Sequence, residues 1–414
     1  MTDARSERLR GKASLYAPAI RALLRPPLGG SCVTAFSCGT GIGTSVRSKK
    51  AFTDAAGGEG RAVFIPEEKD MDAQYQAIRA ALRKRVKGAA PVPALIALQN
   101  TGIFSIAETK AGADAIIRDY IRVFKGEKKA VSGQKNARPE GRVAGKIAVI
   151  TGSAQGFGKG IAEALAREGA SVVIADINGH AARRLAGQIC GALGAGRALA
   201  VDVDVPREDS IKDLMVETVL AYGGCDVFIS NAGILKAGSL EETDLATFEL
   251  VTKINYSAFY LGVKYASRIM KIQHRFDREC VSDIIQINSK SGLEGSTRNF
   301  AYAGGKFGSI GLMQSFALEL VDDRIKVNAV CPGNFFEGPL WSDPEQGLFT
   351  QYLRAKKVPG ARTIEDVKRF YEGKVPMKRG CRIGDVATAV LYVIEQQYET
   401  GQAVPVTGGQ VMLR

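Results

Sequence analysis

A serine, a tyrosine and a lysine stand at a spacing that suits the transfer of a hydride and a proton. Tyr302 and Lys306 follow Ser289 by thirteen and seventeen residues. If Tyr302 begins a helix, Lys306 lies one turn further along the same face. Its ammonium can then hold the phenol's pKa below the usual value of about 10 and make it a general base. Ser289, arriving from a preceding strand, can polarise the oxygen of a substrate. The same tyrosine and lysine on an ordinary helix would be a packed ring beside a solvated amine, so the chemistry depends on the rest of the chain.

A glycine-rich loop lies upstream, between a predicted strand and a predicted helix. The apolar run 147–150 precedes it, and the helical pattern of Ile161 and Leu165 follows it. Glycines at 152, 156 and 158 allow a tight turn and a close approach of the backbone to a pyrophosphate, whose charge would lie at the helix N-terminus. This order of elements predicts a dinucleotide site.

The residue at the end of the next predicted strand bears on which dinucleotide binds. Asp176 lies about twenty residues after the loop, where its carboxylate can accept both hydroxyls of the adenine ribose and repel a 2'-phosphate. Ile177 follows it and Gln155 precedes the second glycine, so neither supplies the cation that NADP requires. Arg183 and Arg184 are interpreted as solvated helix residues. The pattern favours NAD.

The pattern Thr-Gly-x-x-x-Gly-x-Gly at 151–158 resembles the short-chain dehydrogenase/reductase family, and the resemblance extends over roughly 145–414. It implies an α/β fold with a doubly wound (Rossmann) parallel sheet and helices on both faces, NAD(P)-dependent oxidation or reduction of CH–OH groups, and a homo-tetramer or homo-dimer. Four residues receive roles from it: Tyr302 as acid/base, Lys306 lowering its pKa and holding the nicotinamide ribose, Ser289 positioning the reacting oxygen, and Asn255 supporting a water and proton relay.

The resemblance also implies a set of cofactor contacts. The family's Asn-Asn-Ala-Gly stands here as 230–233, and its Asp-Val pair is assigned to 204–205 by the distance to Ser210, with 202–203 as a second register. After the expected nicotinamide loop the family's usual Thr is replaced by Glu337, which leaves the contact to the carboxamide open. The implied cofactor-binding residues are Gly152, Gln155, Gly156, Phe157, Gly158, Asp176, Ile177, Asp204, Val205, Asn231, Ala232, Gly233, Tyr302, Lys306, Pro332 and Gly333.

The substrate is suggested by three further segments. Residues 287–292, 374–381 and 400–412 look like the sorbitol-6-phosphate 2-dehydrogenase branch of the family, including Thr407 where most relatives carry Asp. This likeness implies oxidation of sorbitol 6-phosphate to fructose 6-phosphate with NAD. A phosphorylated substrate needs cations near the catalytic serine. The candidates for phosphate contact are Lys290, Lys378 and Arg379.

Two alternatives to this function remain open. One is the same chemistry on another polyol, an unphosphorylated polyol or a deoxysugar phosphate. The other belongs to a different class of protein, an NAD-binding interaction protein whose N-terminal module recruits a partner. The intact set of Asn255, Ser289, Tyr302 and Lys306 weighs against the second class.

The chain of 414 residues is longer than the dehydrogenase pattern requires. We predict a small basic α/β module at 1–125, a Lys-, Gly- and Ser-rich linker at 126–144 and the dehydrogenase at 145–414. Residues 1–140 hold 24 Lys and Arg against 13 Asp and Glu, most of the net charge of +13. The basic run 79–87 lacks interleaved aromatics, so a solvated helix face is favoured over nucleic-acid binding.

Residues 92–125 predict two strands followed by a helix from about Lys110 to Phe124. This segment resembles the closing part of the class II sugar-phosphate aldolase family. The metal site of such an aldolase needs several histidines. The whole chain has two, His180 and His274, so we expect no metal and interpret the module as a catalytically empty remnant.

Seven scattered cysteines without a Cys-x-x-Cys predict neither a disulfide framework nor a zinc site, and they favour a reducing cytoplasm. An apolar run of about 18 residues is absent from the sequence, so a membrane span is not expected.

Overall fold

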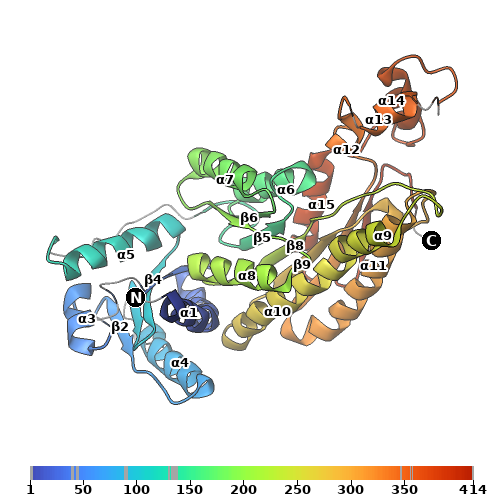
Figure 1. Ribbon diagram of the computed structural model, residues 1–414. Helices are drawn as coiled ribbons and strands as arrows, with labels where there is room; N and C mark the ends of the chain where they lie inside the picture. Colours follow the sequence, from blue (N-terminus) through green and yellow to red (C-terminus); the bar gives the residue numbers. More distant parts are fainter. Residues whose placement is uncertain are drawn as a thin grey trace.

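The computed structural model describes residues 3–38, 42, 46–87, 92–128, 131, 139–345, 347–354, 356 and 358–412. Within these residues the strands form one sheet of seven strands and one of four (Figure 1). The larger sheet has the order β11-β10-β9-β8-β5-β6-β7, and every neighbouring pair is parallel. Its strands are β5 Ile147–Thr151, β6 Ser171–Asp176, β7 Ala198–Asp202, β8 Val227–Ser230, β9 Ser282–Ile287, β10 Ile325–Pro332 and β11 Ala403–Val406.

Helices cover both faces of this sheet, because each parallel connection must cross over a face to return to the same edge. One face carries α6 Gly156–Arg167, α7 Gly179–Leu193 and α15 Ile383–Glu395. The other carries α8 Glu208–Tyr222, α10 Ala258–Phe276 and α11 Phe300–Leu320, and α9 Leu245–Thr252 precedes α10. Strands β5 and β9 are buried along their whole length, as two-sided cover requires. The predicted doubly wound Rossmann sheet is confirmed.

The four-stranded sheet belongs to the N-terminal residues. Its order is β1-β4-β3-β2, with β2 parallel to β3 and the other pairs antiparallel. The strands are β1 Val33–Ser37, β2 Ala62–Ile65, β3 Leu95–Leu98 and β4 Gly102–Ala107; the helices are α1 Asp3–Leu24, α3 Lys49–Ala56, α4 Met71–Lys87 and α5 Lys110–Phe124, with the 3-10 turn η1 Pro26–Leu28. The two predicted strands and the helix to Phe124 are therefore observed as β3, β4 and α5.

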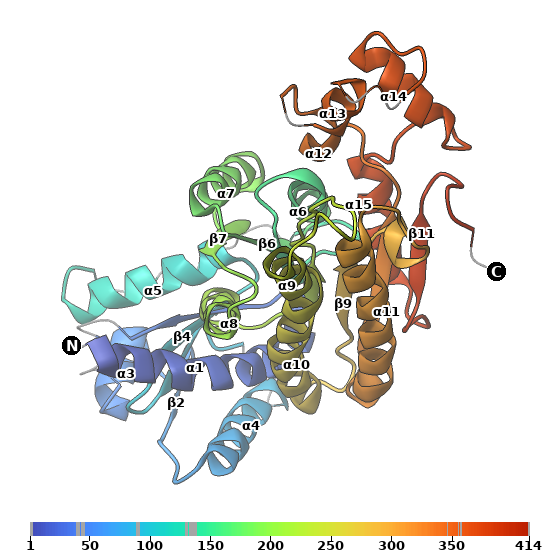
Figure 2. The same cartoon turned by 45° about the vertical axis from the view of Figure 1, so that its right-hand side comes forward.

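The N-terminal elements lie against the seven-stranded sheet at the amino ends of β5 and β8 and along α8 and α10 (Figures 1 and 2). Helix α1 is the central piece of this contact, and its residues join a hydrophobic cluster that continues into the larger sheet. The two sheets therefore share one core. The predicted linker, 126–144, lies in part outside the described residues.

A lid of three short helices follows β10 and projects from the carboxyl ends of the strands (Figure 1). It consists of α12 Pro339–Ser342, α13 Leu348–Arg354 and α14 Ile364–Gly373. The lid has its own small core, made of Phe336, Trp341, Phe349, Val358, Val367 and Val375. Because this core is separate from those of the sheet, the lid is a distinct packing unit next to the site.

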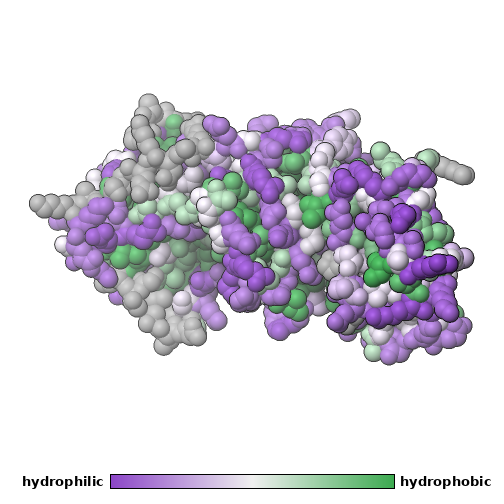
Figure 3. Space-filling view, turned by 90° about the horizontal axis from the view of Figure 1, so that it is seen from above, coloured by the Kyte–Doolittle hydropathy of each residue, from purple (hydrophilic) through white to green (hydrophobic). Residues whose placement is uncertain are grey.

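The face of the molecule seen in Figure 3 is mostly hydrophilic, with scattered apolar patches. In the basic run of α4, Arg83 and Lys84 are exposed, whereas the guanidinium of Arg79 lies 4.7 Å from the ring centroid of Phe276. Among the described helices, none is long and apolar enough to cross a membrane. The described residues also contain no cluster of three histidine, cysteine or acidic side chains that could hold a metal ion.

Candidate active site

Tyr302 and Ser289 are brought together at the carboxyl end of β9. Helix α11 begins at Phe300, so Tyr302 lies in its first turn, and Ser289 follows β9 by two residues. The Ser289 hydroxyl accepts a hydrogen bond from the amide of Ser291 at 3.1 Å, which fixes it at the start of a 3-10 turn, η3 Lys290–Gly292. The Ser289 hydroxyl lies close enough to the Tyr302 phenol to lower its pKa. A substrate oxygen placed at these two hydroxyls would face both a donor and an acid/base.

Lys306 lies one helical turn beyond Tyr302 and is 4% exposed. Its Nζ donates to the carbonyl of Ile287 at 2.9 Å and lies 5.6 Å from the centroid of the Tyr302 ring. Burial lowers the pKa of the Lys306 ammonium to about 8, because the charged form loses hydration. An ammonium with such a pKa can release and regain a proton near neutral pH.

The pKa of the Tyr302 phenol is not held below its ordinary value in this arrangement, and Lys306 is not among the groups that shift it. Burial raises the pKa of the Tyr302 phenol above its ordinary value, and the Ser289 hydroxyl offsets only part of that rise. The lysine approaches the ring and donates to Ile287, so it does not neutralise the phenolate directly. Spacing of four residues placed the two side chains on one face; it did not reveal how strongly the site is desolvated.

This pKa direction leads to a pH dependence. Removal of a hydroxyl proton from an alcohol requires the phenolate of Tyr302, so kcat/KM for oxidation should rise as pH increases from 6 to 10. Carbonyl reduction requires the protonated phenol and should be constant at neutral pH and fall at alkaline pH. Initial rates in both directions across this range test it. A maximum of oxidation near pH 6 would contradict the assignment.

Asn255 lies in a π-helical turn, η2 Lys253–Ser257, between α9 and α10. Its Nδ2 donates to the carbonyls of Ile234 at 2.8 Å and Val251 at 3.0 Å. Its Oδ1 is buried without a hydrogen-bond partner, and a Cβ added at Gly233 would lie 2.7 Å from it and 3.8 Å from Lys306 Nζ. An acceptor with free lone pairs therefore converges with the lysine ammonium beside Gly233. Single π-helical turns of this kind are frequently found at functional sites.

The glycine loop has the shape that a pyrophosphate needs. Gly152 and Gly156 adopt left-handed φ angles of 62° and 58°, which L side chains rarely adopt. A Cβ at Gly158 would lie 2.4 Å from the carbonyl oxygen of Gly152, so only glycine fits where α6 meets the loop. In contrast, nothing lies within 4 Å of the Cβ position of Gly156. That side of the loop is open at the N-terminus of a twelve-residue helix, where an anion is favoured.

Asn231 and Ala232 hold this loop to the neighbouring strand. The side-chain amide of Asn231 donates to the carbonyls of Thr151 at 3.0 Å and Gly152 at 2.8 Å. The Thr151 hydroxyl in turn accepts from the backbone amides of Asn231 and Ala232. The side chain of Asn231 thus shapes the backbone around the site, and the carboxyl ends of β5 and β8 are tied together there.

Asp176 ends β6 beside the loop and is 8% exposed. Its two carboxylate oxygens accept from the amides of Ala154 at 2.8 Å and Asn178 at 2.9 Å. The negative charge is thereby fixed next to the glycine loop with lone pairs remaining for further donors. Ile177 beside it is 77% exposed, Gln155 is also exposed, and neither carries a positive charge.

We predict that Asp176→Ala narrows the preference for NAD over NADP. The substitution removes an acceptor for the ribose hydroxyls and the repulsion of a 2'-phosphate. It is checked by the ratio of kcat/KM for the two cofactors. Asp202→Ala is the matched control, because that carboxylate is exposed and paired with Arg183 at 2.8 Å. An unchanged ratio in Asp176→Ala would count against the role.

The segment after β7 holds the residues that the sequence predicted for the adenine side of the site. The amide of Asp204 donates to the hydroxyl of Ser210 at 2.9 Å, and Val205 is buried. Asp202, the alternative register, is exposed at the end of β7 and engaged by Arg183. These contacts favour 204–205 as the pair that borders the cofactor.

The loop after β10 closes the other side. The amide of Gly333, which follows Pro332, donates to the carbonyl of Val406, and a Cβ there would lie 2.7 Å from Gln410 Oε1. Glu337 points to Arg382, with 3.6 Å between Oε1 and Nε, so it does not replace the missing Thr at the cofactor.

Phe335 in the same loop was not singled out from the sequence. Its ring stacks on that of Phe157 at the start of α6, with centroids 4.4 Å apart. Its neighbour Phe336 packs 4.9 Å from Trp341 in the lid core. The pair Phe335–Phe336 thereby joins the glycine loop to the lid. An aromatic pair after Pro-Gly was the only signal that could have indicated this.

The three predicted phosphate-binding cations differ in what they already contact. Lys290 is adjacent to Ser289 and pairs with Glu294 at 3.3 Å. Lys378 is exposed and donates to the carbonyl of Gly373 at 2.8 Å. Arg379 makes a bidentate pair with Asp385 at 2.6 and 2.9 Å, so its charge is compensated within the protein.

Arg379 also lines a cavity of about 420 Å³ behind the loop that contains Gly333. Thr407, Gly408 and Gly409 form part of its wall, and Ser289 and Tyr302 do not. The cavity therefore does not include the predicted catalytic residues.

These features fit a nicotinamide cofactor: a glycine loop open at a helix N-terminus, a fixed carboxylate beside it, and a hydroxyl pair, lysine and free amide oxygen at the carboxyl ends of the strands. When bound, such a cofactor supplies the carbon that accepts or donates hydride. A family model described as short chain dehydrogenase matches residues 146–341. The chain belongs to the short-chain dehydrogenase/reductase family and is an NAD(P)-dependent oxidoreductase acting on CH–OH groups.

Among its relatives, sorbitol-6-phosphate 2-dehydrogenase of Escherichia coli K12 is 35% identical over 272 residues, which cover 64% of this chain and 99% of that protein. The crystal structure of sorbitol-6-phosphate 2-dehydrogenase from Erwinia amylovora is 36% identical, with a TM-score of 0.59, covering 64% of this chain and all of the other. A 3-ketoacyl-(acyl-carrier-protein) reductase from Brucella melitensis complexed with NADH is 25% identical, with a TM-score of 0.55, covering 65% and 99%.

Proposed function

We propose that this enzyme interconverts a phosphorylated sugar alcohol and a ketose phosphate, with sorbitol 6-phosphate and fructose 6-phosphate as the favoured pair. The observation that carries the proposal is the cluster of Ser289, Tyr302, Lys306 and Asn255 in a chain 35% identical to a sorbitol-6-phosphate 2-dehydrogenase along 99% of its length.

In the oxidation direction each catalytic side chain has a defined task. The Tyr302 phenolate accepts the proton of the substrate hydroxyl, while hydride leaves the same carbon for the cofactor and the C–O bond becomes a carbonyl. Ser289 donates a hydrogen bond to the reacting oxygen. Lys306 and the side-chain amide oxygen of Asn255 pass the proton from the phenol toward solvent. One proton and one hydride leave the alcohol, so the step balances.

NAD is the proposed cofactor. The fixed carboxylate of Asp176 and the lack of a cation at Gln155 and Ile177 support it, because both disfavour a 2'-phosphate. The structure of a relative complexed with NADH is consistent with this choice.

Lys290 is the proposed primary contact for the substrate phosphate. It adjoins Ser289, and its pairing with Glu294 at 3.3 Å is a partly exposed contact that a dianion could replace. Lys378 and Arg379 remain secondary candidates, and the Asp385 carboxylate on Arg379 weakens the case for the latter.

A screen for NADH absorbance with matched substrates tests the proposed function. Sorbitol 6-phosphate should be oxidised with a much higher kcat/KM than sorbitol, and other polyol phosphates should fall between. A preference for an unphosphorylated polyol would replace the proposal by the related polyol alternative. Failure to turn over any alcohol or ketone, with NADH binding intact, would favour the NAD-binding interaction protein.

We propose that the chain consists of three segments: a module at 1–125, a linker at 126–144 and the dehydrogenase at 145–414. We regard the module as a remnant related to class II sugar-phosphate aldolases, without a reaction of its own. The order β3, β4 and α5 supports the first part, and the location of His180 and His274 in the dehydrogenase supports the second.

Two further properties are proposed. The seven free cysteines suit a reducing compartment such as the cytoplasm. A homo-tetramer or homo-dimer is supported by large apolar side chains left exposed on α11, among them Leu318 at 81% and Phe307 at 46%.

A further inference from the structure

We propose that the dehydrogenase of this chain requires its N-terminal module as a permanent intramolecular partner. The surface in question, called here the docking face, consists of α8, α10 and the amino ends of β5 and β8. Its occupant is α1 together with β1 and α4. This requirement is separate from the reaction, because the catalytic residues lie at the opposite, carboxyl ends of the strands.

A fully buried ion pair carries the inference. Arg21 of α1 is 1% exposed and Asp226, immediately before β8, is 0% exposed. The guanidinium donates to both carboxylate oxygens, Nη1 to Oδ1 at 3.0 Å and Nη2 to Oδ2 at 2.6 Å. Its remaining N–H groups donate to the carbonyls of Cys32 at 2.8 Å and Gly145 at 3.3 Å. The guanidinium therefore has hydrogen-bond acceptors both in the N-terminal module and in the dehydrogenase.

Without the module, Asp226 would lose both of its arginine partners. Burial by itself raises the pKa of this carboxyl; the guanidiniums of Arg21 and Arg25, with a smaller contribution from Lys146, more than reverse that effect, so its pKa lies below the usual range. The neutral donors that would remain are the amide of Ile147 at 2.8 Å and the side chain of Gln273 at 3.5 Å. Removing one partner of a buried ion pair leaves an uncompensated charge, which is strongly destabilising.

Three glycines allow the backbone of the dehydrogenase to approach the module closely. A Cβ at Gly145 would lie 2.6 Å from the Ser31 hydroxyl, and one at Gly223 would lie 2.6 Å from Thr34 Cβ. A Cβ at Gly196 would lie 2.7 Å from Lys110 Cβ. Side chains at these three places would push the module away, so the two parts are fitted to each other at backbone distance.

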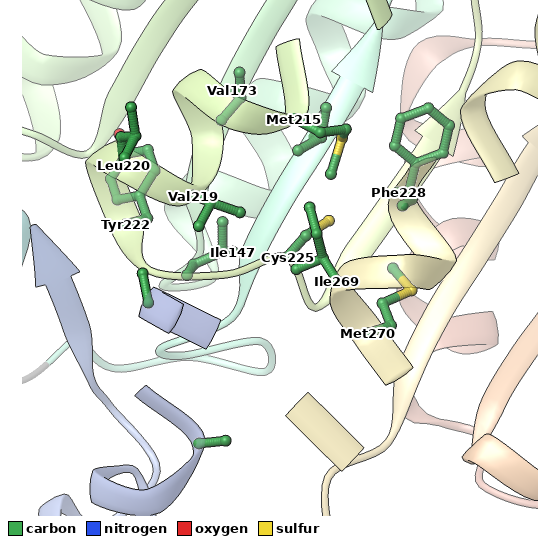
Figure 4. Close-up of a cluster of buried hydrophobic side chains, with 14 of the residues drawn as sticks. Ile147, Val173, Met215, Val219, Leu220, Tyr222, Cys225, Phe228, Ile269 and Met270 are labelled. Atoms are coloured by element: carbon green, nitrogen blue, oxygen red, sulfur yellow. The ribbon is translucent and has the colours of Figure 1, made fainter. Parts of the chain in front are cut away.

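Apolar side chains fill the rest of the contact. Figure 4 shows Met215 and Val219 of α8 in one cluster of buried side chains with Ile269 and Met270 of α10. Residues of α1 that belong to the same buried cluster are Ala13, Tyr16, Ala17, Ile20 and Leu24. The rings of Tyr75 in α4 and Phe276 in α10 lie 5.3 Å apart. Exposing this cluster would remove a continuous part of the core.

The relatives provide a contrast. The sorbitol-6-phosphate 2-dehydrogenase of Escherichia coli is matched over 99% of its length by 64% of this chain, so most of the module has no counterpart there. A dehydrogenase of this size can therefore exist without such a module. In this chain the docking face has become an interior surface.

Substitution of Arg21 in the full chain tests the proposal. We expect Arg21→Met to lower the midpoint of thermal unfolding by on the order of 10 °C. Arg10→Met is the matched control: Arg10 of the same helix pairs with Glu217 of α8 across the same contact, but 38% and 46% of the two side chains are exposed. Its shift should stay within about 3 °C. Equal shifts in the two variants would overturn the proposal.

The double variant Arg21→Met with Asp226→Asn separates charge compensation from lost packing. Because it removes the stranded charge as well, it should regain about half or more of the lost midpoint. If the unfolding midpoint does not recover in the double variant, the loss in Arg21→Met is not caused by the uncompensated charge of Asp226, and the proposal is contradicted.

A second test needs no destabilising variant. A site for a specific protease is inserted between Val131 and Pro139 and cut after the chain has folded. The two fragments should co-elute in size exclusion at 0.5 M NaCl and unfold in one transition. Separation into a free module and a soluble dehydrogenase fragment with unchanged NADH binding and unfolding midpoint would overturn the proposal. Neither readout depends on the identity of the substrate.

Discussion

Replacement of Tyr302 by phenylalanine should lower kcat for alcohol oxidation by a factor on the order of 100 or more and leave NAD affinity nearly unchanged. The substitution removes only the hydroxyl next to Ser289 and keeps the ring beside Lys306. Positioned general acids and bases contribute rate factors of this size, whereas ground-state binding of the dinucleotide depends mainly on the glycine loop and Asp176.

The measurement combines steady-state rates with NADH binding followed by fluorescence. Tyr265→Phe is the matched control, because its hydroxyl also makes one side-chain hydrogen bond, at 2.9 Å to Glu208, on the exposed side of α10. That variant should keep its rate. Retention of full activity in Tyr302→Phe would remove the catalytic assignment, and a parallel loss of NADH affinity would show that the substitution disturbs the fold.

The second large effect concerns the substrate phosphate. Lys290→Ala should reduce kcat/KM for sorbitol 6-phosphate by about 10 to 150-fold, because one charge-assisted contact to a phosphate contributes roughly 1.5 to 3 kcal/mol. Turnover of unphosphorylated sorbitol should hardly change, since the ammonium does not touch the reacting carbon. The relevant measurement is the ratio of kcat/KM for the two substrates in each variant.

Lys378→Ala, made in parallel, shows whether this exposed lysine, which follows α14, shares the role. Lys271→Ala is the control, because that side chain pairs with Asp323 at 3.3 Å on α10, away from η3. If the wild type shows no preference for the phosphate, or if Lys290→Ala impairs both substrates equally, the sugar-phosphate assignment is wrong.

Local sequence determined much of the architecture. The apolar run before Thr151, the glycine spacing and the acid about twenty residues later predicted β5, α6 and the end of β6, because each depends on neighbouring residues and on glycine's freedom to adopt positive φ. The spacing of Tyr302 and Lys306 likewise predicted one helical turn between them. The helix of Lys110–Phe124 was predicted with its observed bounds for the same reason.

Properties that depend on distant segments were decided by the tertiary structure. The raised pKa of Tyr302 comes from desolvation by the assembled site, which no spacing encodes. The stacking of Phe335 on Phe157 likewise requires a contact between two segments that are far apart in the sequence. An arginine counted in the basic surplus of residues 1–140 likewise became the buried partner of Asp226, 205 residues away. The sequence by itself predicted the candidate catalytic residues, because their signals are local. The tertiary structure decided charge, burial and the packing of the two sheets into one core, because those depend on what surrounds each group.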